Sequence, residues 1–488
     1  MKKRKLFSMV LALALILGII IPAYADEVNV TEADVISGTF TPVTGMEMMG
    51  RLSRSINIGD TMEAYNENIC PITEMETAWG ATRIEQWHFE AIAMMGFDAV
   101  RIPIRWDLRM DDNLTINSIW MDRVNEVVDW ALAEGLYVII NTHHVRALYD
   151  PLHYGPYEEA EQWLLAVWEQ IAERFKDYPE QLIFEPMNEP RPGLDGWFWC
   201  NDRFAAGITR EVRTLAAKVN RLNEAVLSLI RESGGNNDRR VVMLTPVQAS
   251  PVFIRAHDHP DDPYTMLGVF LYPGDAANQA YERAEIAHIA AALNAGIPIV
   301  IKETSPYQMS LEDALAWSEI MYPQLAELGV PVFWWNRYGT DYELFDRAMG
   351  EWNYPLLEIF FAAYGATPGE SIQPPPVFPF TITTSIQQTD FTLWARGRGN
   401  AVPYGILYRA DSIVVEFEGR TLSGGYSFSR WEPLPWEHFD RNHPRITEEP
   451  GRIIFDLRGT EGHDIGFAVW NEADVRRITR IYLMGENP

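Results

Sequence analysis

The sequence predicts an α/β fold, a (β/α)8 TIM barrel followed by a C-terminal all-β sandwich module. Eight short apolar runs alternate with amphipathic segments of helical length between about residues 46 and 366, which is typical of parallel βα units. The number of runs favours a closed barrel over an open doubly wound sheet. The open alternative is weakened further because no Gly-x-Gly-x-x-Gly motif follows the first run.

The predicted strands are rich in β-branched residues, as the buried strands of parallel sheets are. They cover residues 55–60, 99–104, 136–144, 182–189, 240–248, 265–272, 297–304 and 330–336. Residues 158–177 repeat Trp163, Val167, Ile171 and Phe175 at intervals of four, which places these side chains on one face of a helix. Similar patterns predict helices over residues 117–135, 209–233, 278–295, 311–329 and 341–364, and the helix after the fifth strand is expected to be short.

Residues 1–25 have the pattern of a secretory signal peptide. A basic cluster at residues 2–5 precedes an apolar run at residues 6–21, and Ala23-Tyr24-Ala25 forms a small-x-small cleavage site. The alternative is a transmembrane anchor, but the run is short for a membrane span. We therefore expect a secreted, extracellular protein without a membrane anchor, in which residues 26–45 form an N-terminal spacer.

A change in composition near residue 366 indicates a second module. We expect the barrel to occupy residues 46–366, a Pro-rich linker residues 367–379, and a β-sandwich residues 380–488. The last region contains many aromatic residues, which fit either an exposed carbohydrate-binding row or the core of the sandwich. They are Trp394, Tyr404, Tyr426, Phe428, Trp431, Trp436 and Trp470.

The charge and the cysteines exclude several classes of protein. The formal net charge is −28 at pH 7, and residues 1–25 contain only basic charges, so a mature chain would be more acidic still. Such a surface repels nucleic acid and anionic membranes and suits a neutral polymer as partner. The two cysteines, Cys70 and Cys200, exclude a disulfide-rich scaffold. Whether they form a bridge depends on geometry that a sequence leaves open.

Polar residues at the ends of the predicted strands indicate where the chemistry lies, since TIM-barrel active sites lie at the C-terminal ends of the strands. Glu189 closes the fourth predicted strand and Glu303 the seventh, roughly across the barrel from each other. A carboxyl group that closes an apolar strand is partly desolvated, which raises its pKa and suits a general acid. Glu185 lies four residues deeper in the fourth strand, where we expect a structural, hydrogen-bonded carboxylate.

Six short motifs occur in order along the predicted barrel. They are Asn57-Ile58-Gly59-Asp60-Thr61, Glu76-Thr77-Ala78-Trp79-Gly80, Phe97-Asp98-Ala99-Val100-Arg101-Ile102-Pro103, Ile140-Asn141-Thr142-His143-His144, Asn188-Glu189-Pro190 and Phe333-Trp334-Trp335-Asn336. Together they resemble glycoside hydrolase family 5, the cellulase family of retaining (β/α)8 enzymes, and within it the endoglucanase and xyloglucanase branch. The resemblance covers about residues 47–365 and rests on all six motifs, because each of them alone is weakly specific.

The resemblance implies a role for each polar residue at a strand end. It implies that Glu189 is the acid/base and Glu303 the nucleophile of a double displacement. The implied substrate is a β-1,4-linked glucan: cellulose, mixed-linkage glucan or xyloglucan. We expect a monomer that needs no cofactor and no metal. The implied substrate-binding residues are Asn188, which holds the sugar 2-hydroxyl, Arg101, which supports the charge of the nucleophile, His143, Tyr272, which contacts the nucleophile, and Trp335, the sugar platform.

Departures from the family pattern bear on activity. Phe270 stands where the family usually has histidine, Lys302 directly precedes Glu303 where glycine is usual, and Asp60 replaces asparagine. Strand alternation predicts that Lys302 points toward the helix layer, where its charge would need solvent or a partner. The alternative function is therefore a catalytically degenerate barrel that binds polysaccharide without cutting it. A secreted esterase or protease is disfavoured, since the sequence has no Gly-x-Ser-x-Gly and no His-Glu-x-x-His motif.

Overall fold

The computed structural model describes residues 40–369, apart from 67–71, 192–208, 275–279 and 341. It also describes residues 392–393, 412–417, 426–431, 437–440, 442–456, 464–469 and 478–484 of the C-terminal region. The expected signal peptide, most of the expected spacer, most of the expected linker and both cysteines lie outside these residues. None of the described helices is long and apolar enough to cross a membrane.

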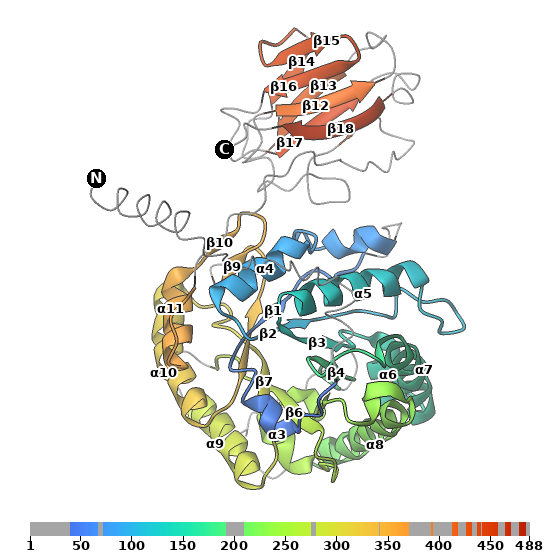
Figure 1. Ribbon diagram of the computed structural model, residues 1–488, viewed down its shortest axis with the longest axis vertical. Helices are drawn as coiled ribbons and strands as arrows, with labels where there is room; N and C mark the ends of the chain where they lie inside the picture. The colour runs from blue at the N-terminus through green and yellow to red at the C-terminus, as the bar shows by residue number, and fades with distance from the viewer. Residues whose placement is uncertain are drawn as a thin grey trace, which may run out of the picture. The chain divides into compact units, whose positions relative to one another are not determined.

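Eight parallel strands close into a barrel in which each strand pairs with the next and β8 pairs with β1 (Figure 1). This pairing of the first and last strands confirms the closed barrel and excludes the open doubly wound sheet. The strands are β1 (Arg54–Ile58), β2 (Ala99–Ile102), β3 (Tyr137–Asn141), β4 (Leu182–Glu185), β5 (Val242–Leu244), β6 (Thr265–Phe270), β7 (Ile299–Thr304) and β8 (Val332–Asn336).

Helices surround the barrel and bury their apolar faces against its outer surface (Figure 1). On α7, for example, Trp168 packs against Phe184 of β4 with 5.3 Å between the ring centroids. The outer helices are α4 (Gln86–Met95), α5 (Ser118–Ala133), α6 (Arg146–Tyr154), α7 (Tyr157–Phe175), α8 (Arg210–Glu232), α9 (Ala280–Asn294), α10 (Leu311–Glu327) and α11 (Tyr354–Ala363). Two 3-10 turns, η3 (Val247–Ala249) and η4 (Pro251–Ala256), follow β5 where a short helix is expected.

The predicted helix over residues 341–364 is wrong in its first half. The short strands β9 (Phe345–Asp346) and β10 (Glu351–Trp352) precede α11 there. The Asn336 side chain, at the end of β8, accepts hydrogen bonds from the backbone N–H groups of Leu344 and Phe345 and donates one to the Phe345 carbonyl. These bonds hold the segment in an extended form that competes with a helix.

The N-terminal end of the barrel is closed by α3 (Gly45–Met49) (Figure 1). Met48 and Met49 of α3 pack on inward side chains of the strands, among them Ile139 and Val300. Gly45 is required at this contact, because a Cβ there would lie 1.9 Å from the Thr265 carbonyl oxygen. With this end filled by an apolar core, the polar side chains of the barrel interior gather at the opposite end.

The C-terminal region forms two antiparallel sheets of four strands each, in the orders β11-β17-β13-β14 and β15-β16-β12-β18. The strands are β11 (Thr392–Leu393), β12 (Ser412–Phe417), β13 (Tyr426–Trp431), β14 (Glu437–Asp440), β15 (Ile446–Glu449), β16 (Arg452–Asp456), β17 (Asp464–Val469) and β18 (Ile478–Met484). Phe439 and Phe455, one from each sheet, are buried with 5.1 Å between their ring centroids. This contact agrees with the predicted sandwich. Of the seven aromatic residues singled out above, Tyr426, Phe428 and Trp431 belong to β13, and the other four lie outside the described residues.

Candidate active site

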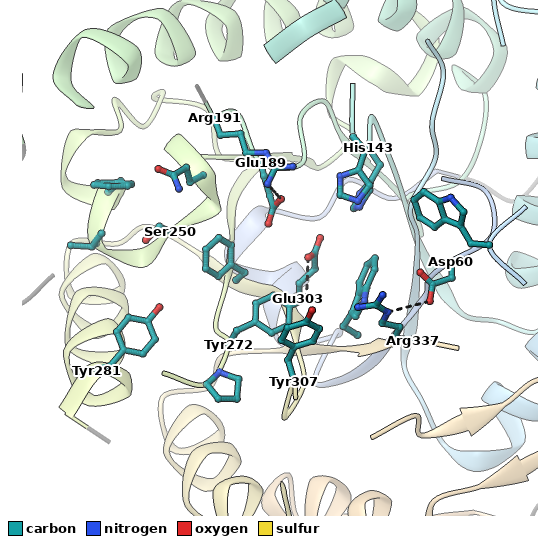
Figure 2. A pocket seen from close by; sticks show the side chains of 18 residues that line it. Asp60, His143, Glu189, Arg191, Ser250, Tyr272, Tyr281, Glu303, Tyr307 and Arg337 are labelled. Carbon is teal, nitrogen blue, oxygen red and sulfur yellow. Dashed lines mark hydrogen bonds and ion pairs between the residues drawn. The ribbon is translucent and has the colours of Figure 1, made fainter. Parts of the chain in front are cut away.

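The seven predicted site residues come together at the C-terminal end of the barrel, around a cavity of about 640 Å³. Figure 2 shows the side chains that line this cavity. Arg101 and Asn188 lie directly beneath the cavity and are buried. The other five line it: His143, Glu189, Tyr272, Glu303 and Trp335.

Arg101 of β2 is the centre of a buried polar network. Its Nε and Nη2 donate to the two oxygens of Glu185 at 2.5 and 2.8 Å, and its Nη1 donates to Oε1 of Glu303 at 2.9 Å. Nη2 also donates to Oδ1 of Asn188 at 2.8 Å. Burial disfavours the charge of Arg101, but the two carboxylates outweigh burial and raise its pKa. The guanidinium therefore stays charged and fixes both carboxylates, as buried ion pairs with full hydrogen bonding do.

The prediction that Lys302 points toward the helix layer is wrong, because β7 contains a bulge. Val269 of β6 pairs with Ile301, and the next residue, Phe270, pairs with Glu303, so Lys302 is an extra residue in β7. A bulge changes the alternation of a strand, and here it turns both Lys302 and Glu303 into the barrel. The Lys302 ammonium is fully buried and donates to Glu185 at 2.5 Å.

The Glu303 carboxylate is held from two sides. Oε1 accepts from Arg101, and Oε2 accepts from the Tyr272 hydroxyl at 3.2 Å. Burial, followed by the charge of Glu303, raises the pKa of Tyr272, so its hydroxyl keeps the proton that it donates. Only 5% of Glu303 is exposed, and the exposed part faces the cavity. These contacts fix the orientation of the Glu303 carboxylate at the edge of the cavity.

Glu189 projects into the cavity opposite Glu303 (Figure 2). Its backbone N–H donates to the Tyr149 hydroxyl at 3.0 Å, and its Oε2 lies 3.5 Å from Nη1 of Arg191. Burial, and then the charge of Glu303, raise the pKa of Glu189 to about 7, although Arg191 opposes the rise. A carboxyl group with this pKa can give a proton near neutral pH and take it back later, as a general acid/base requires.

His143 and Trp335 form one wall of the cavity. Their rings stack at 5.8 Å between centroids with an interplanar angle of 8°. Burial, and then the neighbouring His144, lower the pKa of His143, which therefore stays neutral between Asn141 and Asn188. Trp335 remains partly exposed, and its indole face is available to the apolar face of a pyranose ring.

The adjacent Trp334 points the other way, as strand alternation predicts, and is fully buried against Tyr322 and Phe360. Gly59 backs the Trp335 ring, since a Cβ there would lie 3.1 Å from the indole. The small size of Gly59 therefore leaves room for the indole ring of Trp335.

Several cavity residues were not predicted from the sequence as site residues. Arg191 follows directly after the Asn188-Glu189-Pro190 motif, so its place in the chain was a usable signal. Asp60 and Arg337 lie together at one end of the cavity, with 3.9 Å between Oδ2 and Nε (Figure 2). The loop after β5 lines the opposite end of the cavity with Gln248, Ser250 and Phe253. That loop carries no motif, so only the folded structure identifies them.

Comparisons with known proteins identify the family of the chain. Residues 62–340 match the sequence model of the family described as Cellulase (glycosyl hydrolase family 5). Endoglucanase B of Ruminococcus albus is 29% identical over 365 residues, which cover 70% of this chain and 85% of that protein. Endoglucanase 1 of the same organism is 31% identical over 352 residues, covering 66% of this chain and 82% of that protein.

A solved structure has the same barrel. It is described as a GH5-4 broad specificity endoglucanase from Clostridium longisporum, with a TM-score of 0.59 and 26% identity over 67% of this chain and 99% of that one. The family match covers more than half of the chain and includes β2 to β8. The chain therefore belongs to glycoside hydrolase family 5 and is a glycoside hydrolase.

Proposed function

We propose that this protein is a secreted, retaining endo-β-1,4-glucanase that uses Glu189 as acid/base and Glu303 as nucleophile. The observation that carries the proposal is the pair of carboxyl groups that face each other across the cavity in different environments (Figure 2). Glu303 is held by two donors, whereas burial raises the pKa of Glu189 to about 7. Two carboxyl groups that differ in this way can divide nucleophilic and acid work between them.

In the first step, a glucose unit stacks on Trp335 with its 2-hydroxyl near Asn188. An oxygen of Glu303 attacks the anomeric carbon, and Glu189 protonates the glycosidic oxygen as that bond breaks. In the second step, Glu189 takes a proton from water, which attacks the same carbon and releases Glu303. The anomeric carbon is inverted twice, so its configuration is retained.

An uncharged polymer suits the cavity, and it is not repelled by the strongly acidic chain. Trp79 and Tyr307, each 39% exposed, extend the aromatic lining beyond Trp335, and such rings bind the apolar faces of sugars. The similar proteins named above are endoglucanases. We propose cellulose, mixed-linkage glucan or xyloglucan as the substrate of a monomeric enzyme whose residues 380–488 form a separate module.

Hydrolysis and binding assays on one panel test the proposal. Reducing-sugar release from carboxymethylcellulose, lichenan, xyloglucan, xylan and mannan is measured for the wild type, Glu189→Ala and Glu303→Ala. Glu173→Ala, which changes an exposed carboxylate on α7, is the matched control. We expect activity on one or more glucans that both site variants abolish and that the control retains. A folded wild type that binds glucan but hydrolyses nothing would support the degenerate barrel instead.

A further inference from the structure

The buried pair of Lys302 and Glu185 has no place in the two-step mechanism. Both side chains are fully buried, and taking an ammonium and a carboxylate out of water is costly unless several hydrogen bonds compensate. Glu185 already accepts two bonds from Arg101. A second cation on the same carboxylate therefore needs a reason beyond the neutralisation of Glu185.

The other contacts of Lys302 supply that reason. Its Nζ donates to the backbone carbonyl of Asn188 and lies 3.2 Å from Oγ1 of Thr245. The Asn188 carbonyl belongs to the peptide bond that leads directly into Glu189. Lys302 on β7 therefore holds the backbone from which the acid/base projects.

The surrounding barrel is shaped for this lysine. Gly268 on β6 leaves space for the stem, because a Cβ at that position would lie 2.9 Å from Cδ of Lys302. Asn57 on β1 donates through Nδ2 to the Lys302 carbonyl at 3.0 Å and so satisfies a backbone oxygen at the bulge. The same Asn57 accepts from Arg101 through its Oδ1. The bulge, the glycine and the asparagine together present Lys302 and Glu303 side by side.

We propose that Lys302 is a positioning residue for the acid/base, which ties the end of β4 to the strand of the nucleophile. The inference rests on the proposed roles of Glu189 and Glu303. It explains how a buried lysine stands directly before the nucleophile without removing activity. Lys302 acts on the protonation of the leaving group and not on the binding of the glucan.

Dependence on the leaving group separates this role from a merely structural one. A phenol of low pKa leaves with little help from an acid, whereas a phenol of high pKa needs protonation. The probes are 2,4-dinitrophenyl and 4-methylphenyl β-cellobioside, and kcat/KM reports the step in which the phenol leaves. For Lys302→Met we expect a loss of about tenfold or more on the 4-methylphenyl substrate, a much smaller loss on the dinitrophenyl substrate, and little change in KM.

Charged and titratable groups from six elements act on Glu189 or line the same cavity, and Lys302→Met changes none of them. They are Arg101 on β2, His143 and His144 after β3, Tyr149 on α6, Arg191 after β4, Tyr272 after β6 and Glu303 on β7. Loss of the Lys302 charge, which lowers the pKa of Glu189, is expected to move the basic limb of kcat/KM upward. A shift of this limb is a second readout that a loss of stability alone does not produce.

Two further variants keep the test decisive. Ile301→Val, on the same strand with its side chain in the core outside the barrel, lowers Tm without altering the dependence on the leaving group. Glu185→Gln/Lys302→Met removes both buried charges, so it is expected to fold even where the single variant does not. It should recover Tm and keep the defect on the 4-methylphenyl substrate, because the Asn188 carbonyl still lacks its donor.

The outcomes are distinguishable. Equal losses on both substrates, or full recovery of the rate in the double variant, would show that Lys302 is only a counterion for Glu185, and the inference would be wrong. A folded wild type that releases neither phenol would instead overturn the proposed function itself.

Discussion

Arg191 is expected to set the upper pH limit of the enzyme. Its Nη1 lies 3.5 Å from Oε2 of Glu189, and both side chains are less than a tenth exposed. Burial and Glu303 raise the pKa of Glu189 to about 7, and Arg191 is the largest influence that opposes them. Since the acid must be protonated to act, kcat/KM falls as the pH rises through this pKa.

Arg191→Met removes the positive charge and keeps much of the side-chain volume. An opposite charge at this range lowers a carboxyl pKa by about one to three units, each worth about 1.4 kcal/mol. Burial and the charge of Asp60 raise the pKa of the Glu63 carboxyl group to about 8, which illustrates how far the same two causes can raise a carboxyl pKa. We therefore expect the basic limb of Arg191→Met to move upward by about one unit or more.

The assay is kcat/KM on a soluble glucan across the neutral and alkaline range, with buffers of constant ionic strength. Arg174→Met is the matched control, because Arg174 is an exposed cation on α7 that pairs with Asp122. The control should leave the basic limb in place. A limb that does not move, or moves downward, in Arg191→Met would refute the assignment of that limb to Glu189.

Three further substitutions test the platform, the outer core and the space around the lysine. Trp335→Ala removes the sugar platform and should raise KM about fivefold, equivalent to about 1 kcal/mol, in steady-state assays on a soluble glucan. Trp334→Ala leaves the cavity lining intact but creates a void at a fully buried site. The free energy of unfolding, measured in urea, should therefore fall by about 3–5 kcal/mol. Gly268→Ala places a Cβ 2.8 Å from Sδ of Met243 and 2.9 Å from Cδ of Lys302. We expect it to lower the free energy of unfolding, measured in urea, by about 1–3 kcal/mol and to lower kcat. If Gly268→Ala lowers the stability but leaves kcat unchanged, the packing around the Lys302 stem does not affect the reaction, and this prediction is wrong.

The barrel was predictable because its signals are local and repeated. Each strand is a short apolar run, most of them are followed by a helical pattern, and the count of eight selects a closed sheet. The roles of Glu189 and Glu303 remain proposals, but strand ends and motifs alone placed both carboxyl groups at one cavity. The structural part expected for Glu185 agrees with its contacts to Arg101 and Lys302.

The direction of Lys302 was not predictable, because it depends on a bulge. Alternation with a period of two assumes one residue per rung, and the extra residue between Ile301 and Thr304 breaks that assumption. No residue in β7 marks the bulge in the sequence. The two residues that accommodate it, Asn57 by a hydrogen bond and Gly268 by its lack of a side chain, come from other strands. Contacts of this kind are set by tertiary structure and leave no local pattern.

Trapping of the glycosyl-enzyme tests the central proposal most directly. The protein is incubated with 2,4-dinitrophenyl 2-deoxy-2-fluoro-β-cellobioside, which slows the second step more than it hinders the first, and is then digested and analysed by mass spectrometry. We expect one equivalent of dinitrophenol and a fluorocellobiosyl ester on the peptide that contains Glu303, and neither in Glu303→Ala. A label on another residue, or turnover of natural glucan without any trapped ester and with inverted product by NMR, would contradict double displacement through Glu303.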